Sequence, residues 1–170
     1  MKPLRNPAIL LALLYLCFLG VWAWSGTQLP DRVATHFNLQ GEPNGWMSRP
    51  ANQVFMLIFG LVFPLFVVGL SFAAQFLPAS LINVPNREYW LAPERANQTS
   101  GYFVRHSLWF ACLAVGFVTG IEYSIVQANQ QSSPRLSTPI LLVVVGYFLA
   151  GTFVWVAVLF QHFRRPRQAI

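Results

Sequence analysis

The 170 residues are 55% hydrophobic and only 9% charged, whereas about 25% of the residues of an ordinary soluble domain are charged. This composition excludes an ordinary water-soluble domain, because too few charged side chains are present to cover its surface. The formal net charge of +6 raises nucleic acid as a partner, but the basic residues lie at the edges of apolar runs, where they orient membrane proteins. We therefore expect a lipid bilayer, and no nucleic acid, around this chain.

Four apolar runs predict four transmembrane helices. They cover about residues 7–24, 53–77, 106–127 and 138–160. Roughly 20 apolar residues suffice to cross the hydrocarbon core as a helix, and backbone groups in lipid must bond to one another. The predicted fold class is all-α, with one polytopic four-helix membrane domain over residues 1–170. The first run is interpreted as a retained helix, because Trp22 and Trp24 stand where a signal-peptide cleavage site needs small residues.

The basic residues predict that the N-terminus and the C-terminus are both cytoplasmic. In that orientation eight of the 11 Lys and Arg residues lie inside, and only Arg32, Arg49 and Arg135 lie outside. Cytoplasmic loops carry the excess of positive charge in membrane proteins. We therefore expect an outer loop at 25–50, a cytoplasmic loop at 78–104, and a multi-pass protein of the bacterial cell (inner) membrane.

The outer loop is too long to be a simple connection between two helices. Glycine permits positive φ and proline fixes φ, so Gly41, Pro43 and Gly45 indicate a series of tight turns. Asp31 and His36 are metal-ligand types, but with Glu42 they match no standard metal spacing. We expect a hydrogen-bonded loop and no metal.

The cytoplasmic loop carries an apolar patch at Tyr89 and Trp90, next to the nearly balanced charges of Glu94 and Arg95. One interpretation is a segment that aromatic side chains hold at the membrane surface. The other is a docking surface for a cytoplasmic protein partner, formed by the same four residues.

Glu122 is the only acidic residue within a predicted span. A charged side chain at the bilayer centre costs at least ~2.5–3.5 kcal/mol, and intramembrane acids often mark function. One interpretation is a structural glutamate that shares a polar environment with Thr119, Tyr123 and Gln127. The other is a site for an ion, a proton or a ligand.

The outer loop also contains a motif that follows directly on the first predicted helix. It consists of Pro30, the pair His36-Phe37, the spaced pair Gly41 and Pro43, and Trp46. This motif resembles the defining pattern of a bacterial membrane domain family of unknown function. The same family domain is found at the N-terminus of the immunity protein against the sporulation-delaying peptide toxin. The resemblance implies a membrane protein with an immunity-like or sensor-like role.

No nucleotide-binding glycine loop, serine nucleophile elbow or HExxH zinc motif occurs in the sequence. We therefore expect no enzyme and no cofactor. Our first hypothesis is a non-enzymatic membrane protein that binds a peptide, lipid or protein ligand with its outer loop. The ligand-binding residues of this hypothesis are Asp31, His36, Phe37, Gly41, Pro43 and Trp46.

Two alternatives stay open at the level of sequence. The first is a small transporter, or an accessory transport subunit, that uses Glu122. The second is an intramembrane enzyme that uses His36 with Asp31 or Glu42. The oligomeric state is open as well.

Overall fold

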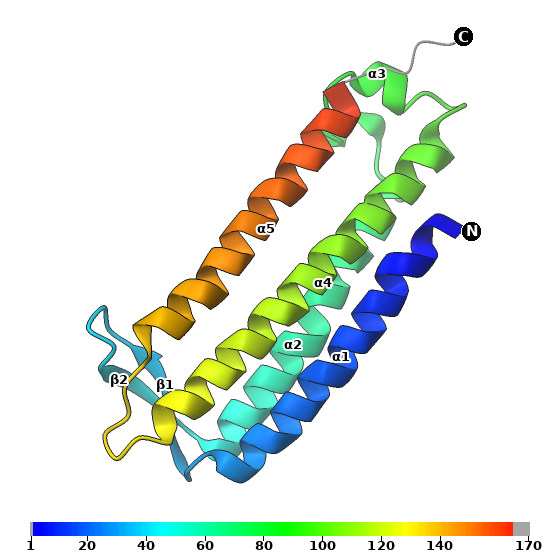
Figure 1. Cartoon of the computed structure of the whole chain (residues 1–170). Helices are drawn as coiled ribbons and strands as arrows, with labels where there is room; N and C mark the ends of the chain where they lie inside the picture. The colour runs from blue at the N-terminus through cyan, green and yellow to red at the C-terminus, as the bar shows by residue number, and fades with distance from the viewer. Residues whose placement is uncertain (1, 165–170) are drawn as a thin grey trace.

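The chain forms a bundle of long helices with a small hairpin at one end (Figure 1). The computed structural model describes the backbone of residues 2–164 and the side chains of residues 6–164. The protein is 75% helical. The four long helices are α1 (Lys2–Gln28), α2 (Arg49–Ala73), α4 (Ala96–Asn129) and α5 (Thr138–Arg164). All four are long and apolar enough to cross a membrane, which confirms the prediction of a polytopic protein with four spans.

The limits of the helices differ from the predicted ones where polar residues extend an apolar run. Helix α2 begins at Arg49, because the Ser48 hydroxyl accepts a hydrogen bond from Ala51 N at 3.3 Å and caps the helix. Helix α4 begins at Ala96, well before residue 106, and its first turn is fixed where the Thr99 hydroxyl donates to Trp90 O at 2.7 Å. The predicted loop at 78–104 is therefore shorter.

The connection between α2 and α4 contains only short helical segments. These are two 3-10 turns, Ala74–Phe76 and Ala79–Leu81, and the short helix α3 (Arg87–Trp90). We refer to residues 74–95 as the α2–α4 connection.

The structure departs from the all-α prediction between α1 and α2. Strands β1 (Arg32–Phe37) and β2 (Pro43–Ser48) form an antiparallel hairpin. Only Gly41 has a positive φ, +77°, among the described glycines. Gly45 lies within β2, where a Cβ would stand 2.8 Å from the Cβ of His36 on the facing strand. The predicted series of tight turns is thus wrong at Pro43 and Gly45, which belong to a strand.

Helix α4 is the centre of the bundle. It packs against α1, α2 and α5, whereas α5 packs mainly on α4 (Figure 1). Within the most apolar stretch of each helix, 56% of α4 is buried inside the protein against 6% of α5. Helix α5 therefore lies at the periphery and turns most of its apolar surface toward lipid.

The core between α1, α2 and α4 is dry and apolar. It is built from the buried side chains of Leu11, Phe18, Met56, Ala111, Cys112, Val115 and Val118. The ring of Phe18 is fully buried and lies directly against Gly60 of α2, so that a Cβ at Gly60 would overlap the ring. Lipid tails are as apolar as these side chains, so close approach of helix backbones at small residues provides much of the association energy.

Gly60→Ala is expected to destabilise the bundle, because the added methyl group overlaps the ring of Phe18. Overpacking of this kind costs about 1–3 kcal/mol. The measurement is the free energy of unfolding in mixed micelles as the fraction of dodecyl sulfate rises. Gly69→Ala, on the same helix, is the control, since nothing lies within 4 Å of its added Cβ. Equal unfolding curves for the two variants would contradict the packing of Phe18 on Gly60.

Candidate functional site

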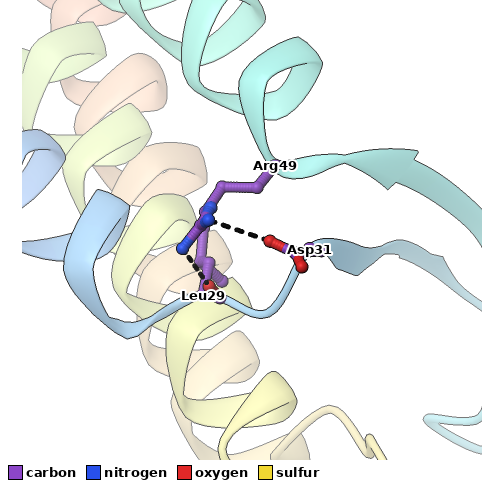
Figure 2. A network of polar contacts seen from close by, with 3 residues as sticks. All are labelled: Leu29, Asp31 and Arg49. Atoms are coloured by element: carbon purple, nitrogen blue, oxygen red, sulfur yellow. Dashed lines mark hydrogen bonds and ion pairs between the residues drawn. The ribbon is translucent and has the colours of Figure 1, made fainter.

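The base of the hairpin carries an ion pair between the residue before β1 and the first residue of α2. Arg49, the first residue of α2, lies 2.8 Å from the Asp31 carboxylate and also donates to Leu29 O at 3.3 Å (Figure 2). Its backbone N–H donates to Asp31 O at 2.9 Å. The Asp31 side chain is 95% exposed, and exposed pairs contribute about 1 kcal/mol or less. The pair therefore fixes the geometry of the hairpin base more than it stabilises the fold.

The side chain of Asn129, near the end of α4, holds the hairpin to the bundle. Its Oδ1 accepts from Ala34 N at 2.8 Å, and its Nδ2 donates to Ala34 O at 2.9 Å. The same Nδ2 donates to Ile125 O at 2.9 Å. One amide side chain thus bonds to β1 as a neighbouring strand would, and satisfies two backbone groups of a residue that is fully buried.

The turn of the hairpin is tied to the connection between α4 and α5. Gly41 O accepts from Leu136 N at 2.9 Å, and a Cβ at Gly41 would stand 2.9 Å from Leu136 O. The positive φ and this close approach both require glycine here. The Arg135 guanidinium donates to Gln40 O at 3.4 Å. The hairpin is therefore held at its base, its middle and its turn.

The predicted outer residues lie along the hairpin but do not converge on one point. Trp46, in β2, is 40% exposed and has the Arg32 guanidinium 4.9 Å from its ring centroid. The ring of His36 hydrogen-bonds the side chain of Asn44, and Phe37 stands opposite Pro43. Within residues 6–164, no three His, Cys, Asp or Glu side chains lie close enough to hold a metal ion.

A buried polar cluster lies beneath the hairpin, where α1, α2 and α4 meet. The Ser25 hydroxyl hydrogen-bonds the Glu122 carboxyl, and Gln53 Nε2 donates to Ser25 Oγ at 2.7 Å. Ser25 also lies 2.8 Å from Trp22 O. Ser25 and Glu122 are both fully buried. The partners of Glu122 thus come from α1 and α2.

Two predicted neighbours of Glu122 on α4, Thr119 and Tyr123, contact other groups instead. The Thr119 hydroxyl donates to Val115 O at 2.7 Å, one turn back on the same helix. The ring of Tyr123 stacks on Trp24, with 6.2 Å between the centroids. The polar environment that was expected along one helix is built between three.

Two buried atoms of the cluster have no hydrogen-bond partner among the described residues. They are Glu122 Oε2 and Asn52 Nδ2. No ion pair to Glu122 is formed by residues 6–164. A buried carboxylate without a cation is costly, so this group of side chains can hold a proton on the carboxyl, or a small guest that bonds Oε2 and Nδ2.

Sequence reasoning identified Glu122 and missed Ser25, Asn52, Gln53 and Asn129. A signal was present in the apolar runs. Ser25 follows the first run, and Asn52 and Gln53 open the second. In an antiparallel pair of spans these positions meet at one end of the bundle, which is where the structure places them.

The α2–α4 connection covers the end of α5 at the opposite end of the bundle. Trp90 is only 4% exposed, and its ring N–H donates to Phe163 O at 3.0 Å. Asn86, with a left-handed φ of 54°, donates from its side chain to the same carbonyl at 3.0 Å. These donors satisfy the last turn of α5, whose carbonyls have no partner within the helix.

Trp90 is therefore an interior residue, and little of its side chain is left for the surface of the predicted apolar patch. Tyr89 is half-buried, with the Arg95 guanidinium 4.0 Å from its ring centroid. Glu94 is exposed. A hollow of about 450 Å³ opens beside them, between residues 83 and 89 of the connection.

The fold and this arrangement of polar groups define a multi-pass membrane protein with a hairpin fixed to one end of its helix bundle. Residues 10–62 match a domain of unknown function, DUF1648. An uncharacterised protein of Archaeoglobus fulgidus is 30% identical in an alignment that covers 92% of this chain and 86% of the relative. The chain belongs to the same family as this relative and carries the DUF1648 domain. No solved structure matches it.

The matched segment contains part of the buried polar cluster. It includes Ser25, Asn52 and Gln53, together with the whole hairpin. Glu122 and Asn129 lie outside it, on α4. The segment therefore supplies the hairpin and three polar side chains of the cluster. Helix α4 adds Glu122 to the cluster and holds the hairpin with Asn129.

Asn129→Leu is expected to release the hairpin, because the backbone N–H and C=O of Ala34 both lose their hydrogen-bond partner. An unsatisfied buried group costs about 1–3 kcal/mol. The measurement is amide hydrogen exchange of residues 32–48 in detergent micelles, which is expected to accelerate. Gln130→Ala is the control, since Gln130 is exposed and bonds only the Gln28 side chain at 3.0 Å. Unchanged exchange in Asn129→Leu would contradict the anchoring role of this amide.

Proposed function

We propose that this protein is a non-enzymatic, multi-pass protein of the bacterial cell membrane that binds a peptide or protein ligand with its outer hairpin. The role is immunity-like or sensor-like, as the family resemblance implies. The observation that carries the proposal is a free strand edge beside an exposed tryptophan, on a hairpin that is held firmly to the bundle.

The free edge is the outer edge of β2, and we infer it from the hydrogen bonds of the Ala34 backbone. Ala34 stands opposite Trp46, yet both of its backbone groups bond to Asn129. In antiparallel sheets, a pair that does not exchange hydrogen bonds directs its N–H and C=O groups away from the facing strand. The backbone of Trp46 is thus directed to the outer edge of β2, and this sheet has only two strands.

An extended peptide matches such an edge, because it adds a strand through main-chain hydrogen bonds. The side chains next to the edge offer apolar contact as well. Trp46 is 40% exposed, and Leu39, in the turn, is 100% exposed. Aromatic side chains that are exposed on a rigid support are the usual anchors of protein interfaces.

The proposed orientation places the hairpin outside and both termini in the cytoplasm. The hairpin end carries Arg32, Arg49 and Arg135, whereas the other eight basic residues belong to the termini or to segments at the opposite end. The positive-inside rule supports this direction of insertion. In this orientation the α2–α4 connection, with exposed Glu94, faces the cytoplasm and is accessible to a protein partner there.

A transporter that uses Glu122 is the second candidate, and the complete burial of this glutamate favours it. The residues between Glu122 and the opposite end of the bundle do not form a polar pathway for a transported substrate through one chain. There the core consists of apolar side chains that include Phe18, Met56 and Val115. An intramembrane enzyme has less support, because His36 and Asp31 bond to different partners, Asn44 and Arg49.

Cysteine labelling is expected to show the hairpin on the outer face of the membrane. In a Cys17→Ala background, an impermeant maleimide is expected to label Gln40→Cys on intact cells and Glu94→Cys only after permeabilisation. Both positions are exposed, whereas Cys112 is buried and serves as an internal control. The reverse labelling order would overturn the orientation and would direct the hairpin to the cytoplasm.

Trp46→Ala and Trp46→Pro are both expected to abolish ligand capture, the first by removing the ring and the second by removing the outward N–H. A proline at an edge position with an outward N–H is tolerated by the sheet. The measurement is photo-crosslinking from a benzoylphenylalanine at Leu39, followed by mass spectrometry of the captured species. Recovery is expected to fall about tenfold or more, as for an aromatic anchor of an interface.

Trp24→Ala is the control for this experiment, because Trp24 is another exposed tryptophan at the same end, 37% exposed. Its capture yield is expected to equal that of the unmodified chain. Equal recovery from all variants would contradict the edge as the recognition element. If no species is captured by the unmodified chain, the Glu122 alternative becomes the better account.

A further inference from the structure

A groove made of two adjoining hollows lies along α4 and α5 at the end of the bundle opposite the hairpin. One hollow of about 350 Å³ lies between the two helices, and a second of about 350 Å³ lies beside it next to α1. His106, Trp109 and Val158 line both hollows, so the two adjoin each other.

The part of the groove between the helices is apolar. Leu113, Val154 and Trp109 line it, and Gly151 leaves a gap that the Leu113 side chain enters. Two polar groups of its one histidine have partners: His106 Nε2 and Trp155 O lie 3.1 Å apart, and the Trp155 ring N–H donates to His106 O at 2.8 Å. This part of the groove therefore offers mainly apolar contact.

The part next to α1 has a polar mouth. Asn6, Tyr102 and Arg105 line it. The Tyr102 hydroxyl is buried and has no hydrogen-bond partner among the described residues. Arg105 lies 5.6 Å from the Tyr102 ring centroid, and forms no ion pair with any acid of residues 6–164. Hydrogen-bond donors from three side chains, one of them cationic, thus line a single hollow.

We propose that this groove binds one anionic phospholipid, whose phosphate lies at the mouth beside Arg105 and Tyr102 and whose acyl chain lies along Trp109, Leu113 and Val154. The charge at the mouth is complementary to a phosphate, and an arginine fork bonds phosphate oxygens well. A soluble anion fits less well, because the mouth adjoins an apolar channel along two membrane-spanning helices. The site is separate from the hairpin and independent of its proposed ligand.

The test is native mass spectrometry of the full chain in detergent with equal amounts of phosphatidylglycerol and phosphatidylcholine. The unmodified chain is expected to retain one phosphatidylglycerol in preference to phosphatidylcholine. Arg105→Gln is expected to lower phosphatidylglycerol occupancy about fivefold, the contribution of one arginine at an anionic lipid surface. Tyr102→Phe removes only a hydroxyl and is expected to lower it about threefold.

Arg164→Gln is the matched control, because Arg164 is an exposed arginine at the same end of the bundle that lines neither hollow. Its occupancy is expected to be unchanged, and an equal loss would overturn the site in favour of general surface charge. Equal retention of the two lipids, or complete displacement by excess inorganic phosphate, would overturn it as well. If Arg105→Gln does not fold, Tyr102→Phe decides, together with Val154→Trp, which fills the groove and is expected to exclude the lipid.

Discussion

The structure depends on the burial of one helix, α4, among the three other long helices. In lipid there is no hydrophobic gain from bringing apolar helices together, so close packing and polar contacts between helices must hold a bundle. Helix α4 provides both kinds of contact. Its middle part packs Val115 and Val118 against the Phe18 region, and its last turns present Glu122 and Asn129 to α1, α2 and β1.

The polar contacts are concentrated at the two ends of the bundle and are nearly absent from its middle. At the hairpin end, Glu122 joins Ser25 and Gln53 within the interior. At the opposite end, the ring of Tyr102 stacks on His162 with 3.6 Å between the centroids, and Trp90 bonds the last turn of α5. This distribution keeps backbone and side-chain polar groups close to the interfaces, where unsatisfied groups cost less than at the bilayer centre.

The number and place of the long helices follow from the sequence, because each apolar run has the length that a membrane requires. The hairpin does not follow. Strand β1 gains its outer hydrogen bonds from Asn129, a residue 95 positions away, and no local pattern indicates such a partner. The burial of Trp90 is a similar case, since its acceptor, Phe163 O, belongs to the last helix.

Glu122 shows where sequence reasoning about the candidate site succeeds and where it fails. An acid within an apolar run is conspicuous, and the structure does bury it. The sequence predicts its partners along its own helix, at Thr119, Tyr123 and Gln127. The structure uses Ser25 and Gln53 instead, which only the packing of α1 and α2 brings to this depth.

The length of α4 has a geometric consequence. At 34 residues and a rise of 1.5 Å per residue, it is about 50 Å long, whereas a bilayer with its headgroups is about 40–45 Å thick. A helix of this length that stands perpendicular to a bilayer is therefore longer than the bilayer is thick. When its last turn lies level with one layer of headgroups, its first turn, where Thr99 holds Trp90, extends past the other.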